Sequence, residues 1–370
     1  MNPDPVTVNM EAEPERRPAT AYEVAELAGV SQSAVSRVFT PGASVSATMR
    51  VKVLDAAQQL GYRPNLVARS LITRRSSLIG VAVPGTANPF YQAALDALSA
   101  SFARIGYRVL LFTSDPTAGS DPLLDEVLRY RVDALVLIST SLSSHFADEC
   151  LQLGLPVVML NRKTDSDSVS SVTGDNRRGA KELAAFLLAG KHRRFAYVAG
   201  LEHSSTNRDR EAGFLEGLAE RKVRQVERVV GNYSTADTES AVRTLLSSAT
   251  PPDAIFCAND YMALVAINLA RAEFGLQVGS DVSIVGFDDI EMARWPLFGL
   301  TTYSQPVELM VRRVVQVVER QLSTAVTPAV QHIIDGELIV RGSARTPQTG
   351  VVRSADHWIW RSRKRSDASR

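Results

Sequence analysis

The chain has 370 residues, of which 45% are hydrophobic and 22% charged, which suits a soluble protein of two to three globular domains. No segment approaches the roughly 18 consecutive apolar residues of a membrane helix, so no membrane association is expected. Two widely separated cysteines exclude a disulfide framework or a cysteine zinc site. Residues 16–75 hold nine Lys or Arg and three Asp or Glu, a net charge of +6. Residues 351–370 hold six basic and two acidic residues, a net charge of +4. Residues 76–350 hold 26 basic and 31 acidic residues, a net charge of −5. A basic head on an acidic body is typical of a nucleic-acid-binding module joined to another domain, although a solvated charged face produces the same balance.

The first residues of the chain are acidic. Residues 1–15 hold four acidic residues and no Lys or Arg, and no apolar segment follows them. A secretory signal peptide has the opposite charge, so a cytoplasmic protein is expected. Residues 1–18 are rich in Pro and Glu and lack periodicity, which predicts a disordered tail.

Three short helices are predicted in residues 19–63. The sequence TAYE at residues 20–23 is a capping box for the first helix, and Gly29 is placed to end it. Ser31 is a candidate cap for a second helix over residues 32–39. Ser46 caps a third, in which apolar residues at 53, 56, 57 and 60 keep helical spacing until Gly61. Two short helices joined by a turn that contains glycine indicate a helix-turn-helix.

The second predicted helix presents Gln32, Ser33 and Arg37 on one face. A Gln side chain can pair with adenine through two hydrogen bonds, an Arg with guanine, and a Ser with either base. These three side chains are therefore candidates for reading bases in the major groove of DNA.

From residue 78 onward, short apolar runs alternate with helix-like segments. The predicted strands are residues 78–84, 107–112, 134–138, 157–160, 195–198, 254–257 and 282–285, and an amphipathic helix is predicted over residues 91–104. Buried strands that alternate with helices predict parallel sheets in α/β layers. About 270 residues of this pattern favour two similar lobes over one large sheet.

Motifs along most of the chain resemble the lac repressor/galactose repressor family. In the basic head they are AYEVAELAGVSQSAVSRV at residues 21–38, VS at 45–46, GYRPN at 61–65 and ARSL at 68–71. In the body they are NPFY at 88–91, PVVMLNR at 156–162, GDN at 174–176, REAGF at 210–214, AND at 258–260, GFDD at 286–289, LTT at 300–302 and, more weakly, GELIVR at 336–341. The resemblance spans residues 20–345.

The resemblance implies an organisation in three parts. These are a helix-turn-helix head over residues 19–63, a hinge helix and linker over 64–77, and a periplasmic-binding-protein-like body over 78–350. The body is expected to consist of two Rossmann-like lobes joined by three crossovers, lobe one at about 78–173 plus 305–335 and lobe two at about 174–304 plus 336–350. A ligand would bind in a cleft between the lobes, at the carboxyl ends of the strands.

The resemblance also implies further DNA contacts. The hinge helix of the family inserts a leucine into the minor groove, and the matching residue here is Leu71, which is otherwise a plain linker residue. Tyr22, Ser31 and Asn65 are expected to contact the DNA backbone.

Nine residues of the body match positions where the family binds its effector. They are Phe90, Tyr91, Asn161, Arg162, Thr206, Arg210, Tyr233, Asn259 and Asp288. Asp288 resembles a carboxylate that accepts ligand hydroxyl or ring N–H groups, and Arg210 a guanidinium whose planar fork suits a carboxylate or adjacent hydroxyls. Alternatively, Asp288 caps the following helix, Arg210 forms a surface salt bridge, and the two tyrosines only fill space. A cation at Arg162 favours an acidic ligand such as a sugar acid, unless its side chain points to solvent. Asp175 and Asp289 are assigned to structure.

The sequence lacks the common catalytic motifs. It contains no phosphate-binding loop, dinucleotide fingerprint, zinc-protease motif or serine-hydrolase elbow, and its five His lack metal-ligand spacing. No enzymatic activity and no cofactor or metal are therefore expected. A ligand-controlled repressor, a solute-binding protein for transport and an architectural DNA-binding protein remain as functions. The basic head and the missing export signal favour a repressor that a small sugar or sugar acid releases from a pseudo-palindromic operator.

The C-terminal residues 351–370 contain no Leu and no apolar heptad. Tetrameric members of the family join their dimers through a helix with a leucine heptad, which this segment cannot form. We therefore expect a homodimer, with residues 351–370 as a disordered basic tail.

Overall fold

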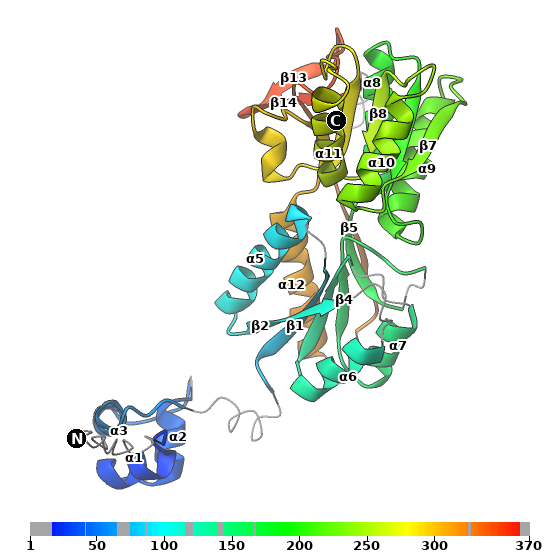
Figure 1. Cartoon of the computed structure of the whole chain (residues 1–370). Helices are drawn as coiled ribbons and strands as arrows, with labels where there is room; N and C mark the ends of the chain where they lie inside the picture. The colour runs from blue at the N-terminus through cyan, green and yellow to red at the C-terminus, as the bar shows by residue number, and fades with distance from the viewer. Residues whose placement is uncertain are drawn as a thin grey trace, which may run out of the picture. The chain divides into compact units, whose positions relative to one another are not determined.

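The computed structural model describes residues 17–40, 42–64, 75–85, 88–114, 121–139, 144–165, 168–324 and 327–362 (Figure 1). The chain divides into two compact units, Met1–Ser76 and Ser77–Arg370, which we call the head and the body. Within the described residues, no helix has both the length and the apolar character needed to cross a membrane.

The head is a three-helix unit. Its helices are α1 (Ala21–Ala28), α2 (Gln32–Val38) and α3 (Ala47–Leu60). The predicted capping box is present, because Thr20 Oγ1 accepts a hydrogen bond from the Glu23 amide at 3.3 Å and the Glu23 carboxylate accepts one from the Thr20 amide at 2.7 Å. Gly29 and Gly61 end α1 and α3 with φ angles of 64° and 65°, which favour glycine.

A small apolar core holds the three helices together. Its buried members are Val24, Ala25, Val35, Val38, Val53, Ala56 and Ala57. The three predicted helices are confirmed, with two differences of detail. Leu60 is 38% exposed because α3 ends there, and Phe39 lies just beyond α2 and is only half-buried.

The first sheet of the body has six parallel strands in the order β11-β5-β4-β3-β1-β2. The strands are β1 (Leu78–Pro84), β2 (Arg108–Ser114), β3 (Ala134–Ile138), β4 (Val157–Leu160), β5 (Ser170–Gly174) and β11 (Gln331–Ile334). The helices are α5 (Pro89–Arg104), α6 (Asp121–Tyr130), α7 (Ser144–Gln152) and α12 (Val307–Ser323). Side chains alternate along the strands, so that Val136 belongs to one core cluster with residues of α5 and α12, whereas Leu137 belongs to another with residues of α6 and α7. This sheet and its helices form the first lobe.

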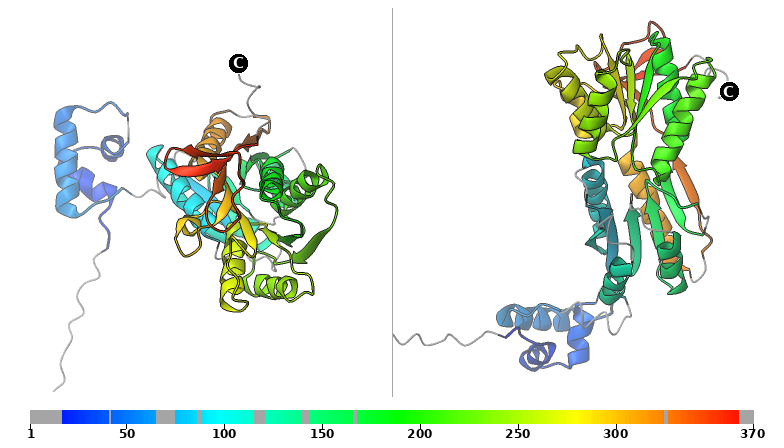
Figure 2. Two further views of the ribbon diagram at one scale, coloured as in Figure 1. Left: turned by 90° about the horizontal axis from the view of Figure 1, so that it is seen from above. Right: turned by 45° about the vertical axis from the view of Figure 1, so that its right-hand side comes forward.

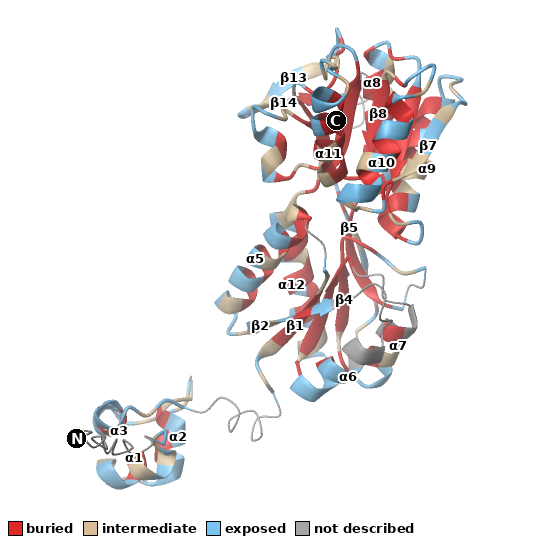
Figure 3. Cartoon of the chain, in the orientation of Figure 1, coloured by how far each residue is buried: buried red, intermediate tan, exposed pale blue. Residues whose placement is uncertain are grey.

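The second sheet has eight strands in the order β13-β14-β12-β10-β9-β8-β6-β7. The strands are β6 (Phe195–Ala199), β7 (Val226–Val230), β8 (Ala254–Cys257), β9 (Ser283–Asp288), β10 (Thr301–Ser304), β12 (Leu338–Val340), β13 (Val351–Ser354) and β14 (His357–Trp360). The helices are α8 (Asn176–Ala189), α9 (Ser205–Ala219), α10 (Thr235–Leu246), α11 (Asp260–Ala272) and the short 3-10 helix η1 (Glu291–Arg294). Figure 3 shows the central strands buried and the outer helix faces exposed. This sheet and its helices form the second lobe.

The chain passes between the lobes three times. It leaves the first lobe after β5 to enter α8, returns after β10 to enter α12, and leaves again between β11 and β12. The predicted parallel α/β body of two lobes is confirmed. The strands predicted over 134–138, 157–160 and 254–257 match β3, β4 and β8 throughout. Short or polar strands such as β5 (SSVTG) and β10 (TTYS) had no apolar run to reveal them.

The predicted disordered tail is wrong for residues 351–362. β13 and β14 form an antiparallel hairpin, drawn in orange-red in Figures 1 and 2, that extends the second sheet beyond β12. Trp360 is 6% exposed, its ring meets Phe186 edge-on at 5.9 Å, and its Nε1 donates to the carbonyl of Thr349 at 3.1 Å. Burial of an indole and two rows of backbone hydrogen bonds order this segment.

Candidate functional site

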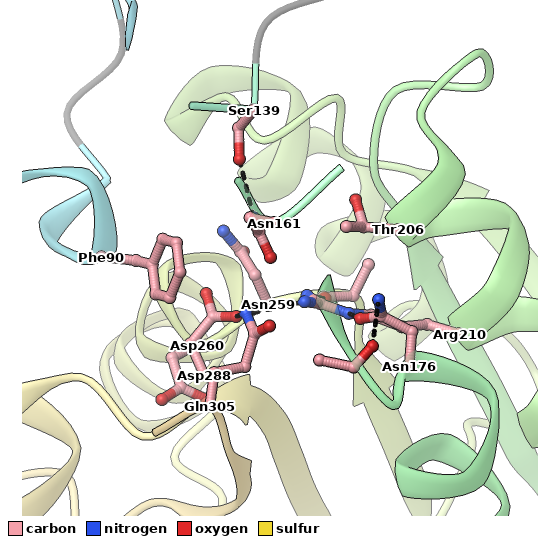
Figure 4. Close-up of polar contacts among 12 residues, drawn as sticks. Phe90, Ser139, Asn161, Asn176, Thr206, Arg210, Asn259, Asp260, Asp288 and Gln305 are labelled. Carbon is pink, nitrogen blue, oxygen red and sulfur yellow. Dashed lines mark hydrogen bonds and ion pairs between the residues drawn. The ribbon is translucent and has the colours of Figure 1, made fainter. Parts of the chain in front are cut away.

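Polar side chains from both lobes meet where strands of the two sheets end. In the first lobe, Ser139 follows β3 and Asn161 follows β4. In the second lobe, Asn259 follows β8 and Asp288 is the last residue of β9. Figure 4 shows these side chains converging on one region. In α/β proteins this edge of a sheet is the usual place for a ligand.

Arg210 is one centre of this cluster. It belongs to α9, is 2% exposed, and donates from Nε to Asn176 Oδ1 at 2.8 Å and from Nη1 to the carbonyl of Ala258 at 2.5 Å. Its Nη2 lies 3.3 Å from Asp288 Oδ1, and its guanidinium carbon lies 3.9 Å from the centroid of the Phe287 ring. The alternative of a surface salt bridge is therefore wrong.

Asp288 is the acidic centre and is 4% exposed. Its Oδ1 also accepts a hydrogen bond from Gln305 Nε2 at 2.7 Å. Burial raises the pKa of this carboxyl, while the charge of Arg210 and hydrogen bonds from Gln305, Arg210 and Asn88 oppose the rise. No side chain caps η1, so the alternative role of Asp288 as a helix cap is also wrong.

Three amide groups around this pair offer unused hydrogen-bonding atoms. In the described structure, Asn161 Oδ1, Gln305 Oε1 and Asn259 Nδ2 are buried and have no hydrogen-bond partner. The other amide atoms of the two asparagines are engaged, since Asn161 Nδ2 donates to Ser139 Oγ at 2.7 Å and Asn259 Oδ1 accepts from the amide of Met262 at 3.0 Å. Buried polar atoms without partners are uncommon in folded proteins, so two acceptors and one donor gathered here are suited to a polar ligand.

Phe90 and Tyr91 line the side of the cluster that belongs to the first lobe. They are 2% and 9% exposed, and the Phe90 ring faces the polar cluster in Figure 4. Burial raises the pKa of Tyr91, while the charge of Arg162 and a hydrogen bond with Ser139 oppose the rise. The Tyr91 hydroxyl thus lies beside polar groups, while the residue is also part of the hydrophobic core of the body.

Arg162, Thr206 and Tyr233 lie at another side of the site. Arg162 is 5% exposed and its guanidinium carbon lies 6.0 Å from the centroid of the Tyr233 ring, so its side chain does not point to solvent. The Tyr233 hydroxyl lies 3.3 Å from Thr206 Oγ1. Thr206 is the second residue of α9. Tyr233 packs against Gly200, where a Cβ atom would lie 2.1 Å from Tyr233 Cζ.

The structure adds three residues that the sequence did not single out. Asn176 and Gln305 hold Arg210 and Asp288, and Asp260 lies fully buried beneath the site. Asn176 belongs to the GDN motif and Asp260 to the AND motif, so the sequence did contain a signal that could have identified both residues. No sequence pattern marked Gln305. Asp175 and Asp289 have the expected structural roles, since Asp175 caps α8 and Asp289 binds Arg341 at 2.6 Å.

The head presents a separate candidate DNA interface. Gln32, Ser33 and Arg37 are all exposed on α2, and Tyr22 is 68% exposed. Ser31 caps α2, because its hydroxyl accepts a hydrogen bond from the Ala34 amide at 3.3 Å. Asn65 and Leu71 lie outside the described residues, as do residues 65–74 of the hinge segment as a whole.

Neither unit offers a metal centre in its described part, where no three His, Cys, Asp or Glu side chains are grouped to hold an ion. The buried thiol of Cys257 has its pKa raised by desolvation, which keeps it protonated and unreactive.

Known families match both units. The model for bacterial regulatory proteins of the lacI family matches residues 20–65, and the model for a periplasmic binding protein-like domain matches residues 184–344. The HTH-type transcriptional regulator CelR of Thermobifida fusca is 31% identical over 89% of this chain and 99% of its own length. Catabolite control protein A of Priestia megaterium is 32% identical over 78% of this chain and 88% of its own length.

Solved structures agree with this assignment. The lac repressor dimer bound to operator and the anti-inducer ONPF superposes with a TM-score of 0.79 at 29% identity, over 89% of this chain and all of that one. The complex of the transcriptional regulator CelR with cellobiose gives a TM-score of 0.67 at 28% identity, over 88% of this chain and all of that one. The chain therefore belongs to the lacI family of bacterial regulatory proteins, and it is a DNA-binding transcriptional regulator and not an enzyme.

Proposed function

We propose that this protein is a cytoplasmic repressor that leaves its operator when a small sugar or sugar acid binds between the two lobes. The observation that carries the proposal is the buried Arg210–Asp288 pair and the amide groups around it. A sugar hydroxyl both donates and accepts a hydrogen bond. Hydroxyl groups can therefore donate to Asp288 and to the free oxygens of Asn161 and Gln305, and accept from Asn259.

The buried cations favour an acidic sugar within this class. Arg210, which lies 3.3 Å from Asp288, is the first of them. Arg162 adds a second buried guanidinium beside Tyr91 and Tyr233. A ligand carboxylate near Arg162 would gain a charge-assisted hydrogen bond in a region of low solvent access. Phe90 would contact the apolar face of the ring, and Thr206 and Tyr233 would close over it.

The head would bind the operator as part of a homodimer. Gln32, Ser33 and Arg37 are exposed on one helix and have the chemistry for base edges, and Tyr22, Ser31 and Asn65 would contact the backbone. Leu71 would enter the minor groove and bend the duplex. Two-fold symmetry of a dimer implies a pseudo-palindromic operator. The similarity of this chain to the lac repressor dimer bound to operator supports this arrangement.

Release of DNA would follow from a shift between two arrangements of the lobes. An effector changes such an equilibrium only through its different affinities for the two arrangements. The groups that would bind it come from both lobes, so its affinity depends on how the lobes are placed. The hinge segment of residues 64–77 leads directly into β1 of the first lobe, so a shift of that lobe would act on the hinge.

A thermal-shift screen of sugars, sugar acids and nucleobases tests the effector class. A ligand at 100 times its dissociation constant stabilises the folded protein by about 2.7 kcal/mol. Fluorescence anisotropy with operator DNA then shows whether the hit weakens DNA binding. Stabilisation by nucleobases alone would overturn the proposed class. A hit that strengthens operator binding would make the protein a repressor that needs its ligand.

A further inference from the structure

Asp260, the first residue of α11, is a fully buried acid that the proposed function leaves unused. Its side chain is 0% exposed. Its Oδ2 accepts a hydrogen bond from the backbone amide of Ile290 at 2.9 Å, and its Oδ1 accepts one from Thr302 Oγ1 at 2.5 Å. Ile290 lies in the turn after β9 and Thr302 lies in β10, so one carboxyl group joins three elements.

Gly286 makes room for this carboxyl group in the middle of β9. A Cβ atom at residue 286 would lie 2.2 Å from Asp260 Oδ1 and 3.1 Å from Asp260 Cα. Any side chain at 286 would push α11 away from β9, so the glycine permits the close approach.

The turn held by Asp260 has an unusual backbone. Asp288 and Asp289 have φ angles of 135° and 59°, and neither is glycine. Such conformations are strained for residues other than glycine and persist only where surrounding contacts hold them. The contacts here are the hydrogen bond from the Ile290 amide to Asp260, the ion pair of Asp289 with Arg341, and a hydrogen bond at 3.0 Å from the Gln305 amide to the Asp288 carbonyl.

Several charged or titratable groups surround Asp260. Asp288 and Asp289 face it from the end of β9, Cys257 faces it from β8, and Arg210 binds the neighbouring Asp288. Burial raises the pKa of Asp260, and the charge of Asp288 raises it further. An asparagine, which resembles the protonated acid in shape and charge, is therefore a close replacement at this position.

We propose that Asp260 is a positioning residue of the effector site, which holds the turn at residues 288–290 so that the Asp288 carboxylate faces Arg210 and the effector. The inference rests on the proposed function, because this orientation of the Asp288 carboxylate matters only if the site binds an effector. It assigns Asp260 no contact with the effector itself.

Three variants of the full-length protein test this role. Asp260→Ala removes both acceptors, and Asp260→Asn keeps one oxygen for the Ile290 amide. The matched control is Asp253→Ala. Asp253 directly precedes β8, Asp260 follows the other end of that strand, and Asp253 accepts from the backbone amides of Arg193 and Arg194 at 3.1 and 2.9 Å.

Amide hydrogen exchange across residues 286–292 is the first readout and requires no ligand. Asp260→Ala should accelerate exchange there by about tenfold or more, because the Ile290 amide loses its partner. Asp260→Asn should stay within about threefold of the wild type, and Asp253→Ala should leave this segment unchanged. Unchanged exchange in Asp260→Ala, or equal acceleration in Asp260→Asn, would overturn the inference. If Asp260→Ala does not fold, Thr302→Val removes one of the two hydrogen bonds and should accelerate the same segment.

Titration calorimetry with D-glucuronate and cellobiose as probes is the second readout. Affinity for the probe that binds the wild type should fall about tenfold or more in Asp260→Ala and be restored in Asp260→Asn. Full affinity in Asp260→Ala would overturn the positioning role. Rejection of both probes by the wild type would count against the proposed effector class, while the exchange experiment would still decide the role of Asp260.

Discussion

Arg210 and Asp288 form an ion pair that is almost entirely withdrawn from solvent, with side chains 2% and 3% exposed and 3.3 Å between Nη2 and Oδ1. Removal of one partner from such a pair costs about 3–5 kcal/mol, because an uncompensated charge stays buried. The pair is therefore both a structural element of the second lobe and the polar centre of the site.

Substitution of Asp288 should separate effector response from DNA binding. Asp288→Asn keeps the size of the side chain and should abolish the effector response, because a coupling of about 1–3 kcal/mol is lost. Operator affinity without effector should stay within about threefold of wild type. Calorimetry with the screened effector and anisotropy with operator DNA measure the two properties. Normal effector binding by Asp288→Asn would show that the site assignment is wrong.

Two ion pairs of opposite polarity join the lobes beside the site. Lys163 of the first lobe lies 3.5 Å from Asp209 of the second, and Asp165 of the first lies 2.6 Å from Arg208 of the second. Their segments also contain Arg162 and Arg210. Exposed pairs of this kind contribute at most about 1 kcal/mol.

A charge exchange tests whether these pairs hold the lobes together. Asp165→Arg places two cations side by side and should weaken effector binding by about twofold to fivefold at low salt. The double variant Asp165→Arg/Arg208→Asp should restore the wild-type affinity. Both effects should fade at about 1 M salt. If Asp165→Arg binds the effector with wild-type affinity at low salt, these ion pairs do not hold the lobes together.

Arg37 should carry base specificity. Arg37→Ala should weaken operator binding by about 1–3 kcal/mol and relax the base preference at one position of each half-site. Arg37→Lys keeps the charge but loses the two-pronged geometry, so it should recover salt-dependent affinity without recovering specificity. Binding-site selection with each variant checks this. Unchanged sequence preference in Arg37→Ala would make Arg37 a phosphate contact.

The buried His192 should make stability depend on pH. Burial lowers the pKa of His192 to about 4, against an attraction from Asp253 that works in the other direction. Since the unfolded chain keeps the ordinary pKa near 6.5, it binds a proton first as the pH falls. The contribution of His192 to the free energy of unfolding should therefore be fully present above pH 6.5 and decline by up to about 3 kcal/mol toward pH 4. Urea denaturation of wild type and His192→Leu across this range isolates the contribution. If the free energy of unfolding changes equally with pH in the wild type and in His192→Leu, His192 makes no such contribution.

The C-terminal hairpin should contribute to the stability of the second lobe. Trp360→Ala leaves a cavity beside Phe186 and should cost about 3–5 kcal/mol. Trp358 is two residues away on the same strand and 52% exposed, so Trp358→Ala should change stability by about 0.5 kcal/mol or less. Equal effects of the two substitutions in chemical denaturation would contradict the packing described here.

Local signals in the sequence determined the head and the framework of the body. The capping box at Thr20 and Glu23 and the terminal Gly29 act on residues close to them in the chain. Their effect can therefore be predicted from the sequence without knowledge of the tertiary structure. Apolar runs such as those of β3, β4 and β8 mark strands that are buried on both faces. The motifs also named Arg210 and Asp288 as candidates for one site.

Only the tertiary structure decided which of these groups meet. Arg210 and Asp288 are 78 positions apart, and Asp260 and Thr302 are 42 apart, so their hydrogen bonds depend on the packing of helices onto the second sheet. Gln305 became part of the site because the crossover after β10 passes beside β9. The C-terminal strands are ordered because β14 pairs with β12 and because Trp360 packs against Phe186. A strand with few apolar residues is stabilised by its neighbours, and those neighbours are distant in the chain.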